Sequence, residues 1–165
     1  MKQLWAPWRL CYIRGEANAP ENGCIFCVRQ IVGEDRQRLI LHRGEHVFVL
    51  MNKFPYSNGH LMIAPYRHTA DPAELTVEEA MEMHRLMVKC RDVLLQRVAA
   101  QGFNIGMNLG QIAGAGIADH LHLHIVPRWS GDTNFMPVFS EVRVIPEHLE
   151  ATYDHLLSAF TGGSR

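Results

Sequence analysis

Hydrophobic and polar residues follow two different periods along this chain. Short apolar runs, rich in β-branched and aromatic residues and separated by polar or turn-forming residues, occupy 39–42, 46–52, 60–66, 103–108 and 120–126. Runs of this length and composition are typical of β-strands. Arg43-Gly44-Glu45 separates the first two runs and predicts a hairpin there. The pattern therefore predicts about five strands.

Between 76 and 102 the apolar positions instead recur every third or fourth residue, which is the period of one helix face. They are Ala80, Met83, Met87, Cys90, Leu94 and Val98. Thr76-Val-Glu-Glu79 fits a capping box, and Gly102 is expected to close the helix. Pro146 opens a second, shorter helix that ends near 160.

Strands, one long helix and further strands predict an α+β fold rather than a series of βαβ units. We expect an antiparallel sheet of about five strands, the long helix and a short C-terminal helix. A chain of 165 residues suits one domain, and the sequence shows neither repeats nor an interdomain linker, so we expect 1–165 to form a single domain. Residues 1–23 lack clear periodicity and are expected to form an irregular but packed lead segment.

Charge and composition exclude several classes of protein. Lys and Arg number 16 against 17 Asp and Glu, which gives a net charge of -1. This balance offers no global field for nucleic acid or an anionic membrane. The apolar runs are too short to cross a bilayer, and no secretory signal pattern is present, so we expect a cytoplasmic protein. That compartment argues against a disulfide framework and leaves the close pair Cys24 and Cys27 to be explained.

The candidate chemistry begins with the stretch HLHLHIV at 120–126. In a strand, alternate side chains share a face, so His120, His122 and His124 would line one side while the leucines anchor the other. Three interpretations remain open from the residues alone. The histidines could be hydrogen-bonded core residues, ligands of a catalytic zinc ion, or a set in which one imidazole attacks phosphorus.

A glycine-rich loop comes directly before these histidines. Asn108, Gly110, Gly114 and Gly116 all lie within it. Small residues allow backbone amides to close around an anion, so we expect a phosphate cradle that opens onto the histidines. The loop has neither the Gly-Lys-Ser/Thr ending of a P-loop nor the dinucleotide fingerprint.

His120-Leu-His122-Leu-His124-Ile-Val126 resembles the histidine triad motif of the HIT superfamily of nucleotide hydrolases and transferases. Segments on both sides extend the resemblance. CIFC at 24–27, FVLMNKFPYSNGHLMIAPYRH at 48–68 and PRWSGDTNFMPV at 127–138 are similar to the branch of diadenosine-tetraphosphate phosphorylases, or ATP adenylyltransferases, and their bacterial relatives. The resemblance implies the HIT-like fold.

The resemblance also implies roles for individual residues. His122 becomes the nucleophile that forms a nucleotidyl-histidine, with its tautomer fixed by an acceptor near His120, and His124 contacts the phosphate and helps the leaving group depart. Asn52 matches the family's ribose-binding position, and Asn108 matches an asparagine at the phosphates. Many HIT hydrolases carry glutamine four residues before the triad, where this chain has Gly116. That departure favours a phosphorylase over a dinucleoside-triphosphate hydrolase.

A metal site is implied by the same resemblance. In zinc-bearing relatives a Cys-x-x-Cys pair joins a histidine after the third strand and the first histidine of the triad. Cys24, Cys27, His68 and His120 match these positions and would hold a structural Zn²⁺. Mg²⁺ is expected to accompany a polyphosphate substrate, and HIT proteins are commonly homodimers.

We therefore expect an enzyme that acts on adenine nucleotides, most specifically on dinucleoside polyphosphates, through a covalent nucleotidyl-His122. Two alternatives stay open: a HIT hydrolase of dinucleotides or nucleoside phosphoramidates, and a nucleotide-binding or zinc-binding module without catalysis. The remaining histidines show no ligand spacing and are interpreted as surface or packing residues; they are His42, His46, His60, His84, His148 and His155.

Overall fold

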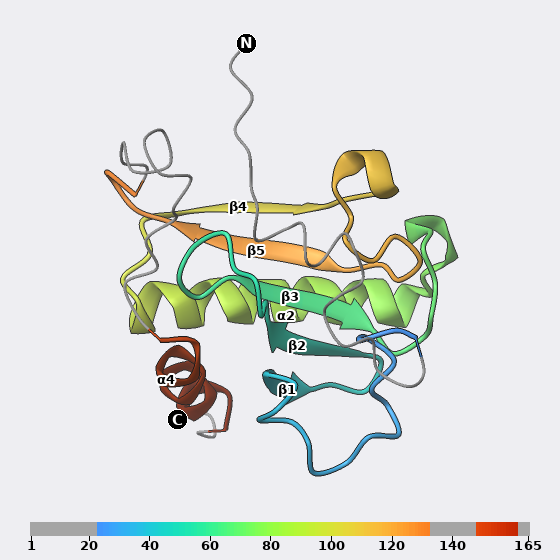
Figure 1. The fold of residues 1–165 in the computed structure, drawn as a ribbon, viewed down its shortest axis with the longest axis horizontal. Helices are drawn as coiled ribbons and strands as arrows, with labels where there is room; N and C mark the ends of the chain where they lie inside the picture. The colour runs from blue at the N-terminus through green and yellow to red at the C-terminus, as the bar shows by residue number, and fades with distance from the viewer. Residues whose placement is uncertain (1–22, 133–147, 162–165) are drawn as a thin grey trace.

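A computed structural model describes residues 23–132 and 148–161 of the chain. Five strands form one antiparallel sheet in the order β1-β2-β3-β5-β4 (Figure 1). The strands are β1 (Ile40–Arg43), β2 (Val47–Met51), β3 (Leu61–Pro65), β4 (Gly102–Met107) and β5 (Leu123–Arg128). The predicted α+β class and strand number are confirmed, while the prediction for 1–22 lies outside the described residues.

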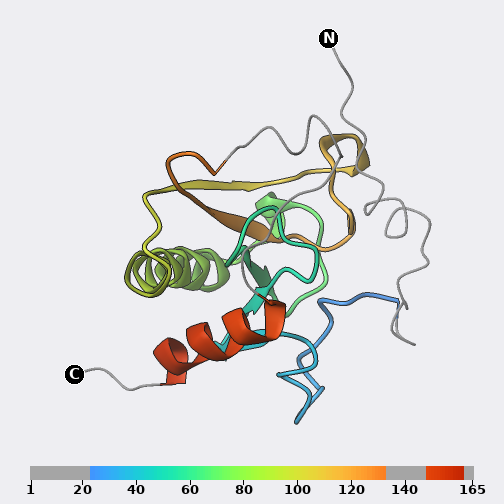
Figure 2. The same cartoon turned by 60° about the vertical axis from the view of Figure 1, so that its left-hand side comes forward.

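Within the described residues two α-helices accompany the sheet, as predicted. The long helix α2 (Val77–Arg97) runs along one face of the sheet, and α4 (Leu149–Thr161) packs against β1 and α2 (Figures 1 and 2). Two short 3-10 turns, η1 (Pro72–Glu74) and η2 (Gln111–Ala113), lie in the connections. The Thr76–Glu79 capping box forms in both directions, so the start of α2 is as the sequence indicates.

The end of α2 differs from the prediction. The helix stops at Arg97: the amide of Val98 makes the last regular helical bond to the carbonyl of Leu94, and the amide of Ala100 then turns back to the same carbonyl. Ala99 takes the left-handed conformation, with φ of 49°, that was expected of a glycine. Gly102 instead opens β4.

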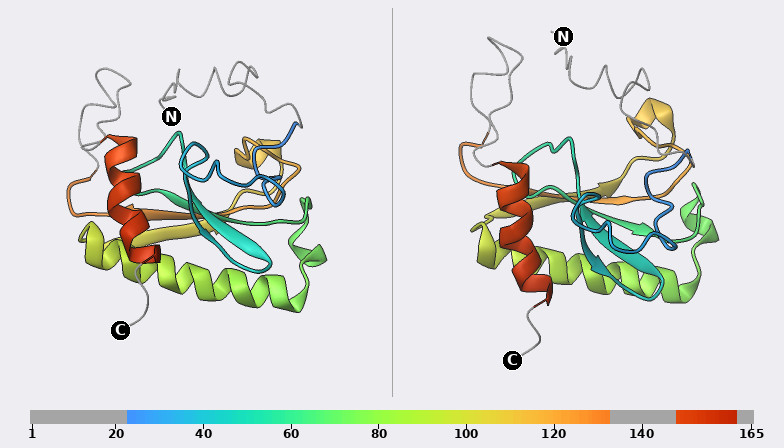
Figure 3. Two further views of the ribbon diagram at one scale, coloured as in Figure 1. Left: turned by 90° about the horizontal axis from the view of Figure 1, so that it is seen from below. Right: turned by 60° about the horizontal axis from the view of Figure 1, so that its bottom comes forward.

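The sheet separates two buried clusters of side chains. On the helix side, strand residues such as Val49, Ile63 and Ile125 pack with residues of α2 and α4. The opposite side carries a smaller cluster from β1, β2 and β3 and from residues 24–28, whose segment passes over the face away from α2 (Figure 3). Met62 belongs to this second cluster and pairs with His124 across β3 and β5. The histidine face of β5 is therefore the face away from the long helix.

A carboxylate of α2 holds the β1–β2 hairpin to the helix. Glu82 accepts hydrogen bonds from the backbone amides of Glu45, His46 and Val47, at 2.9, 2.7 and 3.1 Å. Burial by itself would raise the pKa of Glu82, but these donors hold it below the usual value. At Gly44 a Cβ atom would lie 2.5 Å from the Glu82 carboxylate and 2.7 Å from the carbonyl of Val47, so the turn requires glycine for this close approach.

Candidate active site and metal centre

The three histidines of the motif lie at the start of β5 and all are buried. The strand begins at Leu123, so His120 and His122 precede it, although the sequence predicted one strand from 120. The predicted separation of faces still holds, since Leu123 and Ile125 belong to the helix-side core. The rings of His122 and His124 meet edge to face, with centroids 4.7 Å apart.

One hydrogen bond determines which nitrogen of His122 carries the proton. Its Nδ1 lies 2.8 Å from the backbone carbonyl of His120, and because a carbonyl only accepts, Nδ1–H must be the donor. In the neutral ring, Nε2 then bears a lone pair. Burial lowers the pKa of His122, while the bond to the His120 carbonyl opposes that shift. The ring is therefore neutral near pH 7, with Nε2 as a potential nucleophile.

A fourth histidine imposes the opposite tautomer on His124. The backbone amide of Tyr56 donates to His60 Nδ1 at 3.1 Å, so the proton of neutral His60 lies on Nε2. That Nε2–H donates to His124 Nδ1 at 3.0 Å. In neutral His124 the proton therefore lies on Nε2. His122 and His124 thus offer, at corresponding ring atoms, a lone pair and a proton.

His60, which the sequence presents as a surface or packing residue, also makes a hydrogen bond to the motif. It is fully buried directly before β3. Its contact with His124 depends on the pairing of β3 with β5, which local sequence patterns do not reveal. Asn52 also contacts this group: its Oδ1 accepts from the amide of Phe54, and its Nδ2 lies 3.4 Å from His60 Nδ1. The assignment of Asn52 to a ribose stays a prediction.

A surface groove of about 360 Å³ lies over β4 and β5 beside His124. Asn108, one of the predicted phosphate contacts, lines it together with Tyr56, Asn104 and Arg128. Gly114 and Gly116 do not line this groove. Gly114 adopts φ of 88° after η2, and its amide donates to the carbonyl of Gln111, so that amide serves the turn. The structure therefore brings Asn108 and His124 together without the two glycines.

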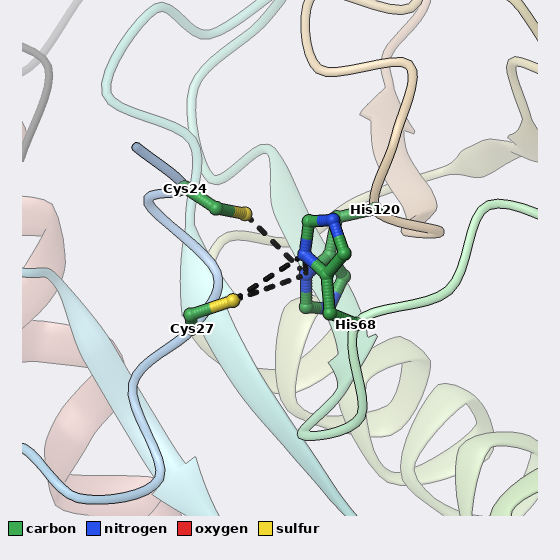
Figure 4. Close-up of side chains that lie close together, drawn as sticks. All are labelled: Cys24, Cys27, His68 and His120. Carbon is green, nitrogen blue, oxygen red and sulfur yellow. Dashed lines mark hydrogen bonds between the residues drawn. The ribbon is translucent and has the colours of Figure 1, made fainter. Parts of the chain in front are cut away.

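The four predicted metal ligands converge at the other end of the motif (Figure 4). One ligand atom from each of Cys24, Cys27, His68 and His120 lies within 4.8 Å of every other. The Sγ atom of Cys24 is 3.4 Å from His120 Nδ1, and that of Cys27 is 3.4 Å from His68 Nδ1 and 3.8 Å from His120 Nδ1. The two Nδ1 atoms are 3.2 Å apart.

These separations suit a tetrahedral zinc site. Bond lengths of about 2.3 Å to sulfur and about 2.05 Å to nitrogen give tetrahedral edges of roughly 3.4–3.8 Å. His120 Nε2–H donates to the carbonyl of Pro65 at 2.8 Å, which directs its Nδ1 lone pair at the sulfurs. Burial lowers the pKa of His120 to about 4, so the ring is a neutral ligand at pH 7. Burial also raises the pKa of the Cys24 thiol, and a bound dication would favour the thiolate.

Comparison with known proteins identifies the family to which this chain belongs. The sequence model of the HIT domain matches residues 33–131. The chain belongs to the HIT family. HIT proteins similar to it include the AP-4-A phosphorylase of Mycobacterium tuberculosis, which is 34% identical over 157 residues that cover 92% of this chain and 80% of that protein.

Other HIT relatives differ in their stated activities. The adenosine 5'-monophosphoramidase of Schizosaccharomyces pombe is 26% identical over 82% of this chain and 96% of that protein. Among solved structures, a zinc-bound histidine triad family protein from Mycobacterium smegmatis has a TM-score of 0.67 and 26% identity, and the alignment covers 87% of this chain and 96% of that one. These matches agree with the predicted HIT fold.

Proposed function

We propose that this HIT protein is a nucleotidyltransferase of the phosphorylase type that acts on dinucleoside polyphosphates such as diadenosine tetraphosphate. The observation that carries the proposal is the opposed pair of tautomers in two adjacent rings, with a lone pair on His122 Nε2 and a proton on His124 Nε2. The 34% identity to an AP-4-A phosphorylase supports the choice of substrate.

In the proposed first step, His122 Nε2 attacks the α-phosphorus and forms a P–N bond. The bond from that phosphorus to the bridging oxygen breaks, and ATP departs with the proton that His124 supplies from Nε2. The carbonyl of His120 accepts from Nδ1–H throughout and stabilises the positive charge that develops on the substituted ring. Inorganic phosphate then attacks the adenylyl group, releases ADP and restores His122.

The groove over β4 and β5 is the proposed location of the departing polyphosphate. Arg128, Asn104 and Asn108 line it, and His124 lies at the same face of β5. Within the described ranges, the only group of three or more His, Cys, Asp or Glu side chains that could hold a metal is the Cys/His cluster. Mg²⁺ would therefore arrive with the substrate phosphates. Asn52 keeps its proposed ribose contact from the family resemblance. Gly114 and Gly116, predicted as phosphate contacts from the composition of their loop, do not line this groove and stay predictions.

We propose that Cys24, Cys27, His68 and His120 hold a structural Zn²⁺. All four protein ligands would complete the coordination, which leaves no open position for a substrate. The ion would tie the segment that precedes β1 to the start of β5. The zinc-bound relative from M. smegmatis supports this assignment.

A homodimer is also proposed, through β4 at the edge of the sheet (Figure 1). An edge strand offers backbone groups to a second strand, and Ile105 on β4 and Leu109 beyond it are both exposed apolar side chains.

Chain 1–165 is proposed to be a single HIT domain, since α4 packs back onto β1. No described helix is both long and apolar enough to cross a membrane, and the cytoplasmic location stays a prediction.

The decisive experiment incubates the zinc-loaded protein with diadenosine tetraphosphate and Mg²⁺, with and without inorganic phosphate, and separates the products by anion exchange. ADP and ATP formed only with phosphate support the phosphorylase. AMP and ATP formed without phosphate assign a hydrolase, and no turnover supports the binding module. His122→Ala should lower kcat by roughly 10³-fold or more, whereas His84→Ala, at an exposed histidine of α2, should not.

A further inference from the structure

Phe26 lies between the two cysteines of the proposed zinc site and touches the proposed nucleophile. Its ring centroid is 4.8 Å from that of His122, with the planes inclined by 30°, and 5.4 Å from that of His120. Only 1% of Phe26 is exposed, whereas 37% of its neighbour Ile25 is. A ring that is covered to this extent is not available to stack on a nucleobase, so its partners are the histidines.

Different contacts of His122 restrict different movements of its ring. The hydrogen bond from Nδ1 to the His120 carbonyl fixes one atom of the imidazole. Rotation about that bond would still move Nε2. Phe26 covers one face of the ring, and His124 meets it nearly edge-on, at an interplanar angle of 75°. Among the described residues these two rings restrict the plane of the nucleophile, and Phe26, inclined by 30°, is the closer of the two to parallel.

The position of Phe26 is itself fixed by the backbone turn that the two flanking cysteines form. The amide of Cys27 donates to the carbonyl of Cys24 at 3.3 Å, and that of Val28 donates to the carbonyl of Phe26 at 2.9 Å, so the segment is a tight turn. A metal ion bound by both sulfurs would fix the two ends of this turn. The ring at its centre would then be fixed as well.

We propose that Phe26 is a positioning residue, whose ring fixes the plane of the His122 imidazole and transmits the order of the cysteine turn to it. The kinetic part of this inference rests on the proposed nucleophilic role of His122. A nucleophile whose ring can tilt reaches the in-line geometry less often, while substrate contacts elsewhere stay the same. Loss of Phe26 should therefore lower kcat more than it raises KM.

Phe48 provides a matched control within the same cluster. It is also fully buried, but its ring stacks on Tyr66, with centroids 5.2 Å apart. Phe26→Leu and Phe48→Leu therefore remove the same atoms from the same side of the sheet. We expect Phe26→Leu to lower kcat by about 10- to 100-fold with KM changed by less than about 3-fold, and Phe48→Leu to change kcat by less than about 3-fold. Equal losses of kcat in the two variants would overturn the proposal.

Nuclear magnetic resonance supplies a readout that needs no turnover. In zinc-loaded protein labelled with ¹⁵N-histidine, His122 should give sharp ring signals of a single Nδ1–H tautomer, and Phe26→Leu should broaden or shift them while zinc content stays at the wild-type level. Unchanged His122 signals in that variant would overturn the proposal. If wild type shows no turnover, the proposed function fails, yet this measurement still decides the role of Phe26.

A third measurement covers the case in which Phe26→Leu does not fold. Wild-type protein is treated with a chelator, and the same ring signals are followed as metal leaves. Release of the cysteine turn should mobilise Phe26 and broaden the His122 signals before the protein unfolds. Sharp, unshifted His122 signals in folded, metal-free protein would refute the link through Phe26.

Discussion

The hydrogen bond from His60 to His124 can be tested by two substitutions that each keep one half of it. In His60→Asn, the short amide can still accept from the Tyr56 backbone through Oδ1, but it does not reach His124. In His60→Gln, the longer side chain can place an N–H near the former Nε2 and donate to His124, while it loses the acceptor for Tyr56.

The expected size of the effect follows from that one bond. Removing the donor to the buried His124 Nδ1 costs about 1–3 kcal/mol. At 1.36 kcal/mol for each factor of ten, the preference of His124 for the Nε2–H tautomer falls by about 5- to 150-fold. The other tautomer has no proton on Nε2 for the leaving group, so kcat of His60→Asn should fall, by at most this factor.

Steady-state kinetics with diadenosine tetraphosphate and phosphate measure this effect, and urea unfolding supplies the control for stability. His60→Gln should retain kcat within about tenfold of wild type and lose about 1–3 kcal/mol of unfolding free energy, because the Tyr56 amide is left without its acceptor. If both variants lose kcat equally, or if His60→Asn stays within twofold of wild type, His60 does not set the tautomer of His124.

Three further predictions concern the metal, the assembly and the pH dependence of stability. The protein should purify with one zinc per chain, and a chelator should lower Tm by about 5–15 °C in calorimetry. Ile105→Asp on the exposed edge of β4 should halve the mass measured by light scattering, and an unchanged mass would exclude that edge. Because the pKa of Glu82 is lowered in the folded state, its contribution of about 1–3 kcal/mol is complete above pH 4.5 and is lost as the pH falls through the lowered value. Glu82→Gln should therefore be less stable than wild type in urea at pH 6, and the difference should shrink as the pH falls through the lowered pKa of Glu82.

The sequence predicts those parts of this protein that depend on local order. The capping box at Thr76 and Glu79 and the alternation from Leu121 to Ile125 act between near neighbours, so their patterns survive into the fold. The end of α2 was misplaced by several residues because Ala99, without any glycine signal, adopts the left-handed conformation. The left-handed conformation of a single alanine costs little free energy, so the packing around it decides where the helix ends.

The candidate site also has parts that the sequence predicts and parts that it does not. Cys24 and Cys27 are only three positions apart and belong to a recognisable motif, and their approach to His68 and His120 follows the family resemblance. His60 and Phe26 have no such signal. Each acts through a ring that lies 64 or 96 residues away along the chain, and only the register of β3 on β5 and the path of residues 24–28 reveal those contacts. Glycines 114 and 116 show the reverse case, in which a suggestive composition does not place a residue at the groove.

The two faces of β5 contact different parts of the protein, so substitutions selected on one face change different properties from those on the other. Side chains such as Leu123 and Ile125 face the helices, while His124, Val126 and Arg128 line the groove on the other side. A substitution on the helix side alters how firmly the strand is held and affects every substrate alike. A substitution at Val126 alters the wall of the groove and leaves the helix packing in place. Substrate preference and thermal robustness can therefore drift independently along a single strand of six residues.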